Sequence, residues 1–217
     1  MSKIKLFDPY IDKFENIAIQ KVLQSHFWAS GAGTGEVKKF ENKFLKYVNS
    51  KSCVAVNSGT AALTLALSMY DIKNKEVILP SLSFVATANA VIENGGIPKF
   101  VDIDENTLCL DPKKVVKAIS KKTKVILPVH FGGLTSNLKS ISKICKENKI
   151  SLVEDAAHAA GSSHLSKKIG SHGELVCFSF HPVKNLAMPT GGLISINSKY
   201  HKKIAKILKE KRWCGIS

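Results

Sequence analysis

Arginine is almost absent from this sequence, although the chain is strongly basic. The 217 residues hold 32 lysines and arginines against 17 aspartates and glutamates, and Arg212 is the single arginine. Arginine is the side chain best suited to bidentate contacts with bases and phosphates, and the lysines are spread along the whole chain. We therefore expect no nucleic-acid partner. The densest basic run, residues 199–212, is interpreted as the solvated face of an amphipathic helix, with a membrane-surface helix as the alternative.

Cysteine is present but follows no known pattern. The five cysteines are odd in number, lie far apart, and form no Cys-x-x-Cys or Cys-x-x-His motif. The chain therefore offers neither a disulfide framework nor a zinc site, and we expect no metal. Three of them lie in apolar runs where a thiol behaves as a small hydrophobic group, which predicts core positions for Cys53, Cys109 and Cys177.

Long hydrophobic runs are also missing. No stretch of about 18 apolar residues could span a bilayer, and the N-terminus has no apolar segment of the kind found in signal peptides. We therefore expect no membrane association and a cytoplasmic location. With 44% hydrophobic and 23% charged residues the chain should fold as a globular protein, and its length allows one large domain or one domain and a fragment.

Short apolar runs alternate with segments of helical periodicity. Strand-length runs lie at residues 53–56, 76–79, 99–101, 124–129, 151–153, 177–180 and 193–196. Helical spacing covers residues 11–23, 37–48, 60–69, 84–93, 112–119 and 137–148, and Asp111 before Pro112 is typical of a capped helix start. Alternation of this kind requires crossover connections and predicts an α/β fold with a mainly parallel sheet.

Residues whose side chains could bind a ligand or take part in catalysis follow directly after these runs. Ligands of open parallel sheets gather at the carboxyl ends of the strands, so the residues there are the first candidates for a site. The five segments are Asn57-Ser58-Gly59-Thr60, Pro80-Ser81-Leu82-Ser83-Phe84, His130-Phe131-Gly132-Gly133, Glu154-Asp155-Ala156-Ala157-His158 and His181-Pro182-Val183-Lys184.

Ser58-Gly59-Thr60 precedes a predicted helix, where free backbone N–H groups and the positive helix end can hold a phosphate. The same residues would equally serve as an ordinary helix cap. Neither Gly-x-Gly-x-x-Gly after a strand nor Gly-x-x-x-x-Gly-Lys-Ser/Thr occurs, so a dinucleotide site or a nucleoside-triphosphate loop is not indicated.

Asp155 and Lys184 are the two charged residues least like surface residues. Asp155 ends an apolar run and is followed by alanines, while Lys184 lies in an apolar segment that contains proline and is followed by glycines. Burial would lower the pKa of the lysine and make a neutral amine available. The alternatives are a helix N-cap for Asp155 and a lysine that extends its amine into solvent. Together with a phosphate site, these groups are what pyridoxal phosphate requires.

The sequence resembles the DegT-type sugar-nucleotide aminotransferases, which belong to the fold type I class of pyridoxal phosphate enzymes. The resemblance extends from about residue 19 to residue 215. It is carried by Asn57-Ser58-Gly59-Thr60-Ala61-Ala62-Leu63, Val77-Ile78-Leu79-Pro80-Ser81-Leu82-Ser83-Phe84, Phe100-Val101-Asp102-Ile103-Asp104, Val129-His130-Phe131-Gly132, Glu154-Asp155-Ala156-Ala157-His158-Ala159 and Phe178-Ser179-Phe180-His181-Pro182-Val183-Lys184-Asn185-Leu186.

This resemblance implies a three-layer sandwich and a cofactor, pyridoxal 5′-phosphate, with a role for each matching position. Lys184 would form the Schiff base and move the proton, and Asp155 would bind the pyridinium nitrogen. The remaining implied roles are phosphate contacts for Gly59, Thr60, Ala61 and Ser179, ring stacking for Phe84, a contact with the phenolic oxygen for His158, and substrate contacts for Thr34, Gly35 and His181.

The implied reaction moves an amino group from an amino acid, glutamate in the first instance, to a nucleotide-linked keto-deoxysugar used for amino sugar or polysaccharide synthesis. Residues 1–217 would form the cofactor-binding large domain, in which residues 1–35 provide an N-terminal helix and a substrate loop. The family pattern continues beyond residue 217, so we expect the small C-terminal domain to be missing. The partners that the resemblance implies are a second copy of the chain, or another chain that supplies the missing part.

Two departures keep other functions open. The family usually has Gly-Glu-Gly-Gly after the lysine, whereas this chain has Pro189-Thr190-Gly191-Gly192. The second departure is the length of the chain, and a shortened chain could also be a non-enzymatic cofactor-binding or interaction module. The third alternative is a related sugar dehydratase, but that enzyme has histidine in place of the lysine, so Lys184 argues against it.

Overall fold

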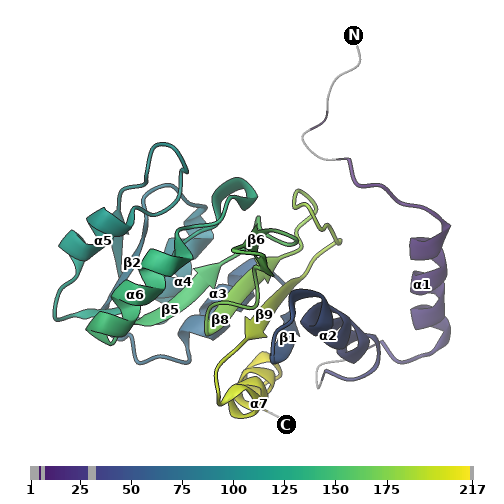
Figure 1. Ribbon diagram of the computed structural model, residues 1–217. Helices are drawn as coiled ribbons and strands as arrows, with labels where there is room; N and C mark the ends of the chain where they lie inside the picture. The colour runs from purple at the N-terminus through teal and green to yellow at the C-terminus, as the bar shows by residue number, and fades with distance from the viewer. Residues whose placement is uncertain (1–4, 6–7, 29–32, 216–217) are drawn as a thin grey trace.

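The computed structural model describes residues 5, 8–28 and 33–215, and its centre is a seven-stranded sheet (Figure 1). The strand order is β1-β9-β8-β5-β4-β2-β3, and every pairing is parallel except those that β9 makes with β1 and β8. The predicted α/β class with a mainly parallel sheet is confirmed. The strands are β1 (Ser52–Val56), β2 (Glu76–Pro80), β3 (Ile97–Val101), β4 (Thr123–Ile126), β5 (Ser151–Asp155), β8 (Leu175–Ser179) and β9 (Gly192–Ile196).

Helices cover both faces of the sheet, because successive side chains of each strand point to opposite faces. In β2, Val77 and Leu79 pack into one core cluster with helices α3, α4 and α7, whereas Ile78 packs into another with α5 and α6. Helix α2 packs with β8 in a third cluster on the α6 side. The result is the predicted three-layer sandwich. Its helices are α2 (Gly35–Val48), α3 (Gly59–Leu67), α4 (Val85–Glu93), α5 (Pro112–Ala118), α6 (Leu138–Asn148) and α7 (His201–Arg212).

Local sequence explains where these helices begin and end. The Asp111 side chain accepts a hydrogen bond from the N–H of Lys113, and Pro112 occupies the first turn, as predicted. Helices α2 and α6 end at Asn49 and Lys149, which adopt the left-handed conformation. Shorter elements are the 3₁₀ turn η1 (Phe131–Gly133) and the hairpin of β6 (Ser163–His164) and β7 (Lys167–Lys168).

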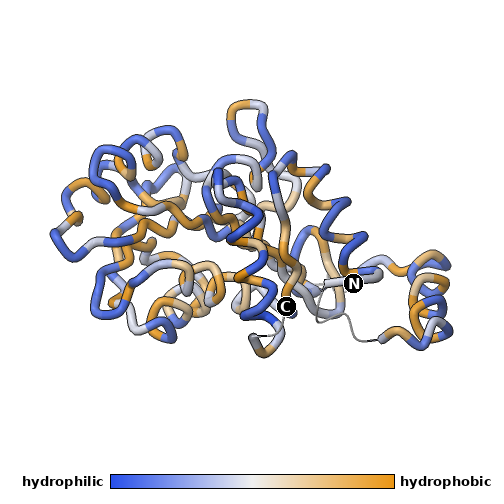
Figure 2. The backbone as a smooth tube through the Cα atoms, turned by 90° about the horizontal axis from the view of Figure 1, so that it is seen from below, coloured by the Kyte–Doolittle hydropathy of each residue, from blue (hydrophilic) through white to orange (hydrophobic). Residues whose placement is uncertain are grey.

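Helix α1 (Lys13–Gln24) lies apart from the layered body in both views (Figures 1 and 2). Asp12 and Glu15 form a capping box that satisfies backbone N–H groups at its start. None of its residues is buried, and apolar side chains such as Phe14, 67% exposed, face solvent.

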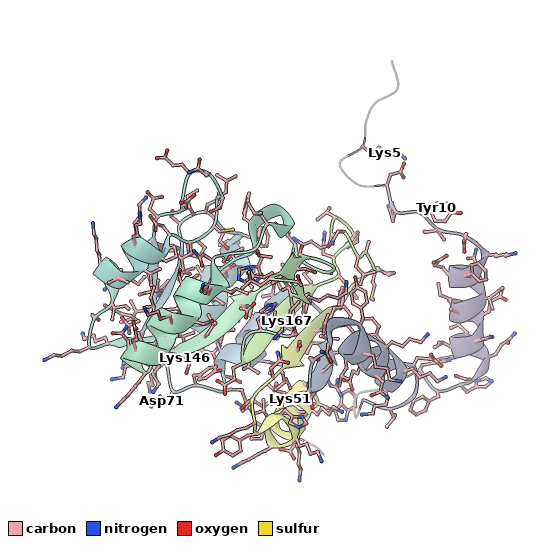
Figure 3. The ribbon with its side chains drawn as sticks, in the orientation of Figure 1. Lys5, Tyr10, Lys51, Asp71, Lys146 and Lys167 are labelled. Atoms are coloured by element: carbon pink, nitrogen blue, oxygen red, sulfur yellow. The ribbon has the colours of Figure 1, made fainter. Side chains whose placement is uncertain are left out.

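Basic residues are distributed over the surface, as the sequence predicts. Lys5, Lys51 and Lys146 are exposed on separate parts of the molecule (Figure 3). Among the helices of the described residues, none has the length and apolar character needed to cross a bilayer.

Candidate active site

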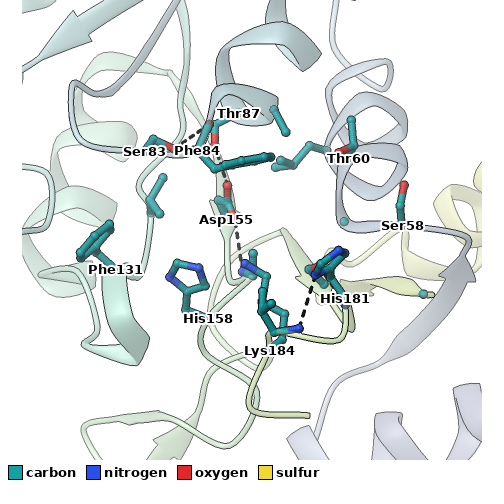
Figure 4. Close-up of a pocket in the computed structure, with 18 of the residues that line it drawn as sticks. Ser58, Thr60, Ser83, Phe84, Thr87, Phe131, Asp155, His158, His181 and Lys184 are labelled. Atoms are coloured by element: carbon teal, nitrogen blue, oxygen red, sulfur yellow. Dashed lines mark hydrogen bonds between the residues drawn. The ribbon is translucent and has the colours of Figure 1, made fainter. Parts of the chain in front are cut away.

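A cavity of about 290 Å³ opens at the carboxyl ends of the strands. This is the edge where the sequence predicts a site, and the residues that line it come from segments far apart in the chain (Figure 4). Among the lining residues are the predicted Gly59, Thr60, Phe84, Asp155, His158, Ser179, His181 and Lys184.

The N-terminus of α3 provides the free amides of the cavity. Ser58 caps the helix: its hydroxyl accepts from the N–H of Ala61 at 3.1 Å, and its carbonyl accepts from Ala62 at 3.0 Å. The first amides of a helix have no acceptor within it, so the N–H groups of Gly59 and Thr60 are left for a ligand. The helix-cap reading and the phosphate reading of this motif are therefore compatible. Ala61 is not among the lining residues, and the cap uses its amide.

Two glycines let the backbone close around this point. A Cβ atom on Gly59 would lie 2.6 Å from the Cβ of Ser179, and one on Gly192 would lie 2.2 Å from the carbonyl oxygen of Ser58. Both distances are shorter than any ordinary contact. Glycine at these positions therefore lets the Ser179 side chain approach the start of α3, and its hydroxyl and the free amides form a cradle of donors suited to a phosphate.

Asp155 ends β5 and is 4% exposed. Its Oδ1 accepts a hydrogen bond from the N–H of Ala157 at 3.1 Å, and its Oδ2 accepts from the hydroxyl of Thr87 at 2.8 Å (Figure 4). The carboxylate is thus fixed at both oxygens while it still lines the cavity.

Lys184 lies in the turn after β8, where its N–H donates to the carbonyl of His181 at 2.8 Å. Burial lowers the pKa of its amine, and the negative charge of Asp155 opposes this shift in part. A larger fraction of the amine is therefore neutral near pH 7 than for an ordinary lysine, as the sequence analysis predicts.

His158 enters the cavity from the segment after β5. Its Nδ1 accepts the backbone N–H of Gly132 at 3.2 Å, which assigns the ring hydrogen of the neutral form to Nε2. Gly132 adopts φ of +59° in the η1 turn, and this left-handed conformation aims its N–H at the ring. Burial lowers the pKa of His158, and the nearby Lys184 lowers it further against the effect of Asp155.

These groups fit pyridoxal phosphate. Amides and a hydroxyl suit its phosphate, a buried carboxylate suits its ring nitrogen, and a partly neutral lysine suits its aldehyde. Phe84, 73% exposed at the start of α4, provides an aromatic wall for the cavity.

Two of the residues expected to contact the substrate do not line this cavity. Thr34 and Gly35 are at the start of α2 and are not among the residues that line the cavity. Residues 30–32 of the same glycine-rich segment fall outside the described part of the chain. Thr190 lines the cavity and donates its hydroxyl to the carbonyl of Asn57 at 2.6 Å, in place of the glutamate of the family pattern.

Sequence reasoning missed Thr87 and the role of Gly132. Thr87 is a polar residue in the first turn of the mostly apolar helix α4, three positions after Phe84, the N-cap residue that also lines the cavity. That spacing is the signal that could have identified it. Gly132 belongs to a segment that follows a strand, but no pattern in the sequence indicates which side chain receives its N–H.

The chain is similar to a protein of spore coat polysaccharide biosynthesis and to solved aminotransferases. It is 40% identical over 192 residues to the spore coat polysaccharide biosynthesis protein SpsC of Bacillus subtilis, covering 88% of this chain and 49% of SpsC. It resembles the putative sugar aminotransferase Spr1654 of Streptococcus pneumoniae in its PLP-form, with 27% identity, a TM-score of 0.89 and coverage of 96% and 57% of the two chains. PseC of Helicobacter pylori, involved in pseudoaminic acid biosynthesis, shows 28% identity, a TM-score of 0.86 and coverage of 95% and 55%.

The chain therefore spans about half the length of the relatives it matches. Spr1654 was solved in both PLP- and PMP-forms, so the expected cofactor and the expected aminotransferase class are confirmed at the level of the family. The family model matches residues 9–215, and on this match the chain belongs to the DegT/DnrJ/EryC1/StrS aminotransferase family.

Proposed function

We propose that this chain forms the cofactor-binding part of an aminotransferase that transfers an amino group from an amino acid to a nucleotide-linked keto-deoxysugar. The observation that carries the proposal is the meeting of Lys184, Asp155 and the free amides of α3 in one cavity. When bound, pyridoxal phosphate would supply an electron sink and a carrier for the amino group.

Each side chain then has a defined task. Lys184 Nζ, kept partly neutral by burial, takes up and returns a proton at the reacting carbon. The Asp155 carboxylate holds a proton at the ring nitrogen, and His158 donates Nε2–H to the phenolic oxygen. The N–H groups of Gly59 and Thr60 bind the phosphate, together with the hydroxyl of Ser179.

The sugar acceptor is supported by the relatives. SpsC is named for spore coat polysaccharide biosynthesis, and PseC is named as an aminotransferase involved in the biosynthesis of pseudoaminic acid. This proposal includes a nucleotide group attached to the sugar and glutamate as the amino donor. The basic surface of the chain, with net charge +15, favours an anionic substrate.

A partner surface is part of the same proposal. Phe84, Val85 and Val183 are 73%, 61% and 48% exposed around the cavity. Exposed apolar side chains in a cluster are typical of a surface that another protein covers. We expect a second copy, or a second chain with the remainder of the family's length, to cover them, with residues 1–217 acting as the large domain.

The test is a visible absorbance spectrum of the purified chain with pyridoxal phosphate, followed by borohydride reduction and peptide mapping. The expected result is one labelled residue, Lys184, and loss of the label in Lys184→Ala. Lys146→Ala is the matched control, because this lysine is exposed and lies outside the cavity. Label spread over many lysines, or an unchanged spectrum in Lys184→Ala, would refute the proposal.

The acceptor and donor require a second measurement. Addition of glutamate should shift the absorbance of the loaded protein, and a nucleotide-linked keto sugar should then restore it, as a ping-pong transfer requires. If the free keto sugar restored the absorbance equally well at the same concentration, the protein would not recognise the nucleotide group.

A further inference from the structure

Thr87 connects α4 to the buried carboxylate of the cavity. It is 1% exposed, and its hydroxyl lies 2.8 Å from Asp155 Oδ2. The Ser83 hydroxyl lies 2.6 Å from Thr87 Oγ1 (Figure 4). A carboxylate can only accept, and a hydroxyl carries a single hydrogen, so Thr87 donates to Asp155 and Ser83 donates to Thr87. The three groups form a chain of hydrogen bonds with one direction.

This arrangement fixes Asp155 without neutralising it. Thr87 binds Oδ2 and the N–H of Ala157 binds Oδ1, so the carboxyl group cannot rotate freely. The ion pairs found within the described residues do not include Asp155. A lysine or arginine would compensate the carboxylate charge and weaken its hold on a proton, whereas a hydroxyl leaves most of that charge in place.

We propose that Thr87, supported by Ser83, is a positioning residue that orients the Asp155 carboxylate toward the ring nitrogen of the bound cofactor. The inference rests on the proposed function, since it needs a pyridine nitrogen in the cavity. The chain of hydroxyls strengthens the contact because each bond in a series polarises the next, and the bond from Thr87 to Asp155 is itself buried.

A purely structural role predicts something different. If Thr87 only joins α4 to β5, its loss lowers stability but leaves the protonation of the cofactor nitrogen unchanged. Thr87→Val keeps the shape and removes the hydroxyl, while Thr87→Ser keeps the hydroxyl. Thr64→Val is the matched control: Thr64 Oγ1 donates to Glu93 Oε2, also at 2.8 Å, between α3 and α4, and neither residue lines the cavity.

The measurement is the ¹⁵N chemical shift of ring-labelled pyridoxal phosphate bound to each variant, together with its dissociation constant. We expect Thr87→Val to move the signal toward that of the unprotonated nitrogen and to weaken binding about tenfold, the order of one charge-assisted hydrogen bond. Thr87→Ser should restore both values, Ser83→Ala should show a smaller change in the same direction, and Thr64→Val should match the wild type.

The outcomes separate the two proposals. An unchanged ¹⁵N shift and dissociation constant in Thr87→Val, with normal binding by the wild type, would overturn the role of Thr87 and leave the proposed function intact. Failure of the wild-type chain to bind pyridoxal phosphate specifically at Lys184 would overturn the proposed function and this inference with it.

Discussion

Glu41 is a buried carboxylate in α2 that joins three elements of the fold. It is 2% exposed, and its Oε1 accepts from the N–H of Ala55 in β1 at 3.0 Å and from Arg212 at the end of α7 at 3.0 Å. Lys209 Nζ lies 3.3 Å from Oε2, close enough for an ion pair although not aligned as a hydrogen bond. Arg212 also donates to the carbonyl of Ala55 at 2.7 Å.

We expect Glu41→Gln to lower the free energy of unfolding by about 3 kcal/mol. The variant keeps the size of the side chain and can keep the bond from Ala55, but it leaves the Arg212 side chain, 12% exposed, without its counter-charge. Breaking a buried pair by removal of one partner costs about 3–5 kcal/mol, and the amide retains part of the hydrogen bonding. For a chain of this length the melting temperature should fall by about 6–12 °C.

Urea unfolding followed by circular dichroism measures this change, with Glu36→Gln as the matched control. Glu36 lies on the same helix and pairs with Lys39, but both side chains are more than 60% exposed, so we expect a change below about 0.5 kcal/mol. In a double-mutant cycle, Arg212→Met should cost less in the Glu41→Gln background than in the wild type. A Glu41→Gln variant as stable as Glu36→Gln, or additive effects in the cycle, would refute the reasoning.

Three further predictions concern the cavity and the cysteines. Gly59→Ala should weaken binding of pyridoxal phosphate by at least tenfold, because the new Cβ would lie 2.6 Å from Ser179 Cβ; equal dissociation constants for the variant and the wild type would contradict the cradle. His158 should titrate below its ordinary pKa of 6.5 in an NMR pH series because burial disfavours its cation, so its contribution to stability is lost as the pH falls through that lower value; a midpoint at or above 6.5 would contradict this. The exposed Cys214 should be the one thiol that reacts rapidly with a disulfide reagent at pH 8, because burial raises the pKa of Cys53 and Cys145 to about 12, and Cys214→Ser should remove the fast phase.

The sequence predicts that these residues gather in one place because a parallel sheet brings its strand ends together. Residues after β1, β5 and β8 are distant along the chain, yet Gly59, Asp155 and Lys184 meet at one edge of the sheet. That convergence depends only on strand direction, which the alternation of strands and helices indicates. The core positions predicted for Cys53, Cys109 and Cys177 are confirmed. Their burial follows from the apolar runs around them, which become buried strands or pack beside them.

Other features of the structure depend on contacts between distant parts of the chain, which no local sequence pattern indicates. Glu41 lies in an amphipathic helix among lysines, where a carboxylate is normally solvated, and its burial follows from the position of Arg212 far along the chain. The strands of the β6–β7 hairpin have two residues each, too short to show alternation. The predicted helix at 60–69 instead ends at Leu67, because the peptide N–H groups of Ser68 and the next two residues close a final turn.

The reversed strand β9 explains why the segment after Lys184 needs a glycine pair. Strand β9 lies between β1 and β8 and runs against both, so it begins at the edge of the sheet where its neighbours end. Gly192 is the register partner of both Val56 and Ser179. The Cβ atom of any other residue there would lie 2.2 Å from the carbonyl oxygen of Ser58, and this clash would force the start of α3 away from Ser179. The approach of α3 to the end of β8, and with it the phosphate cradle, therefore depends on the first residue of β9, the strand that follows the segment with the lysine.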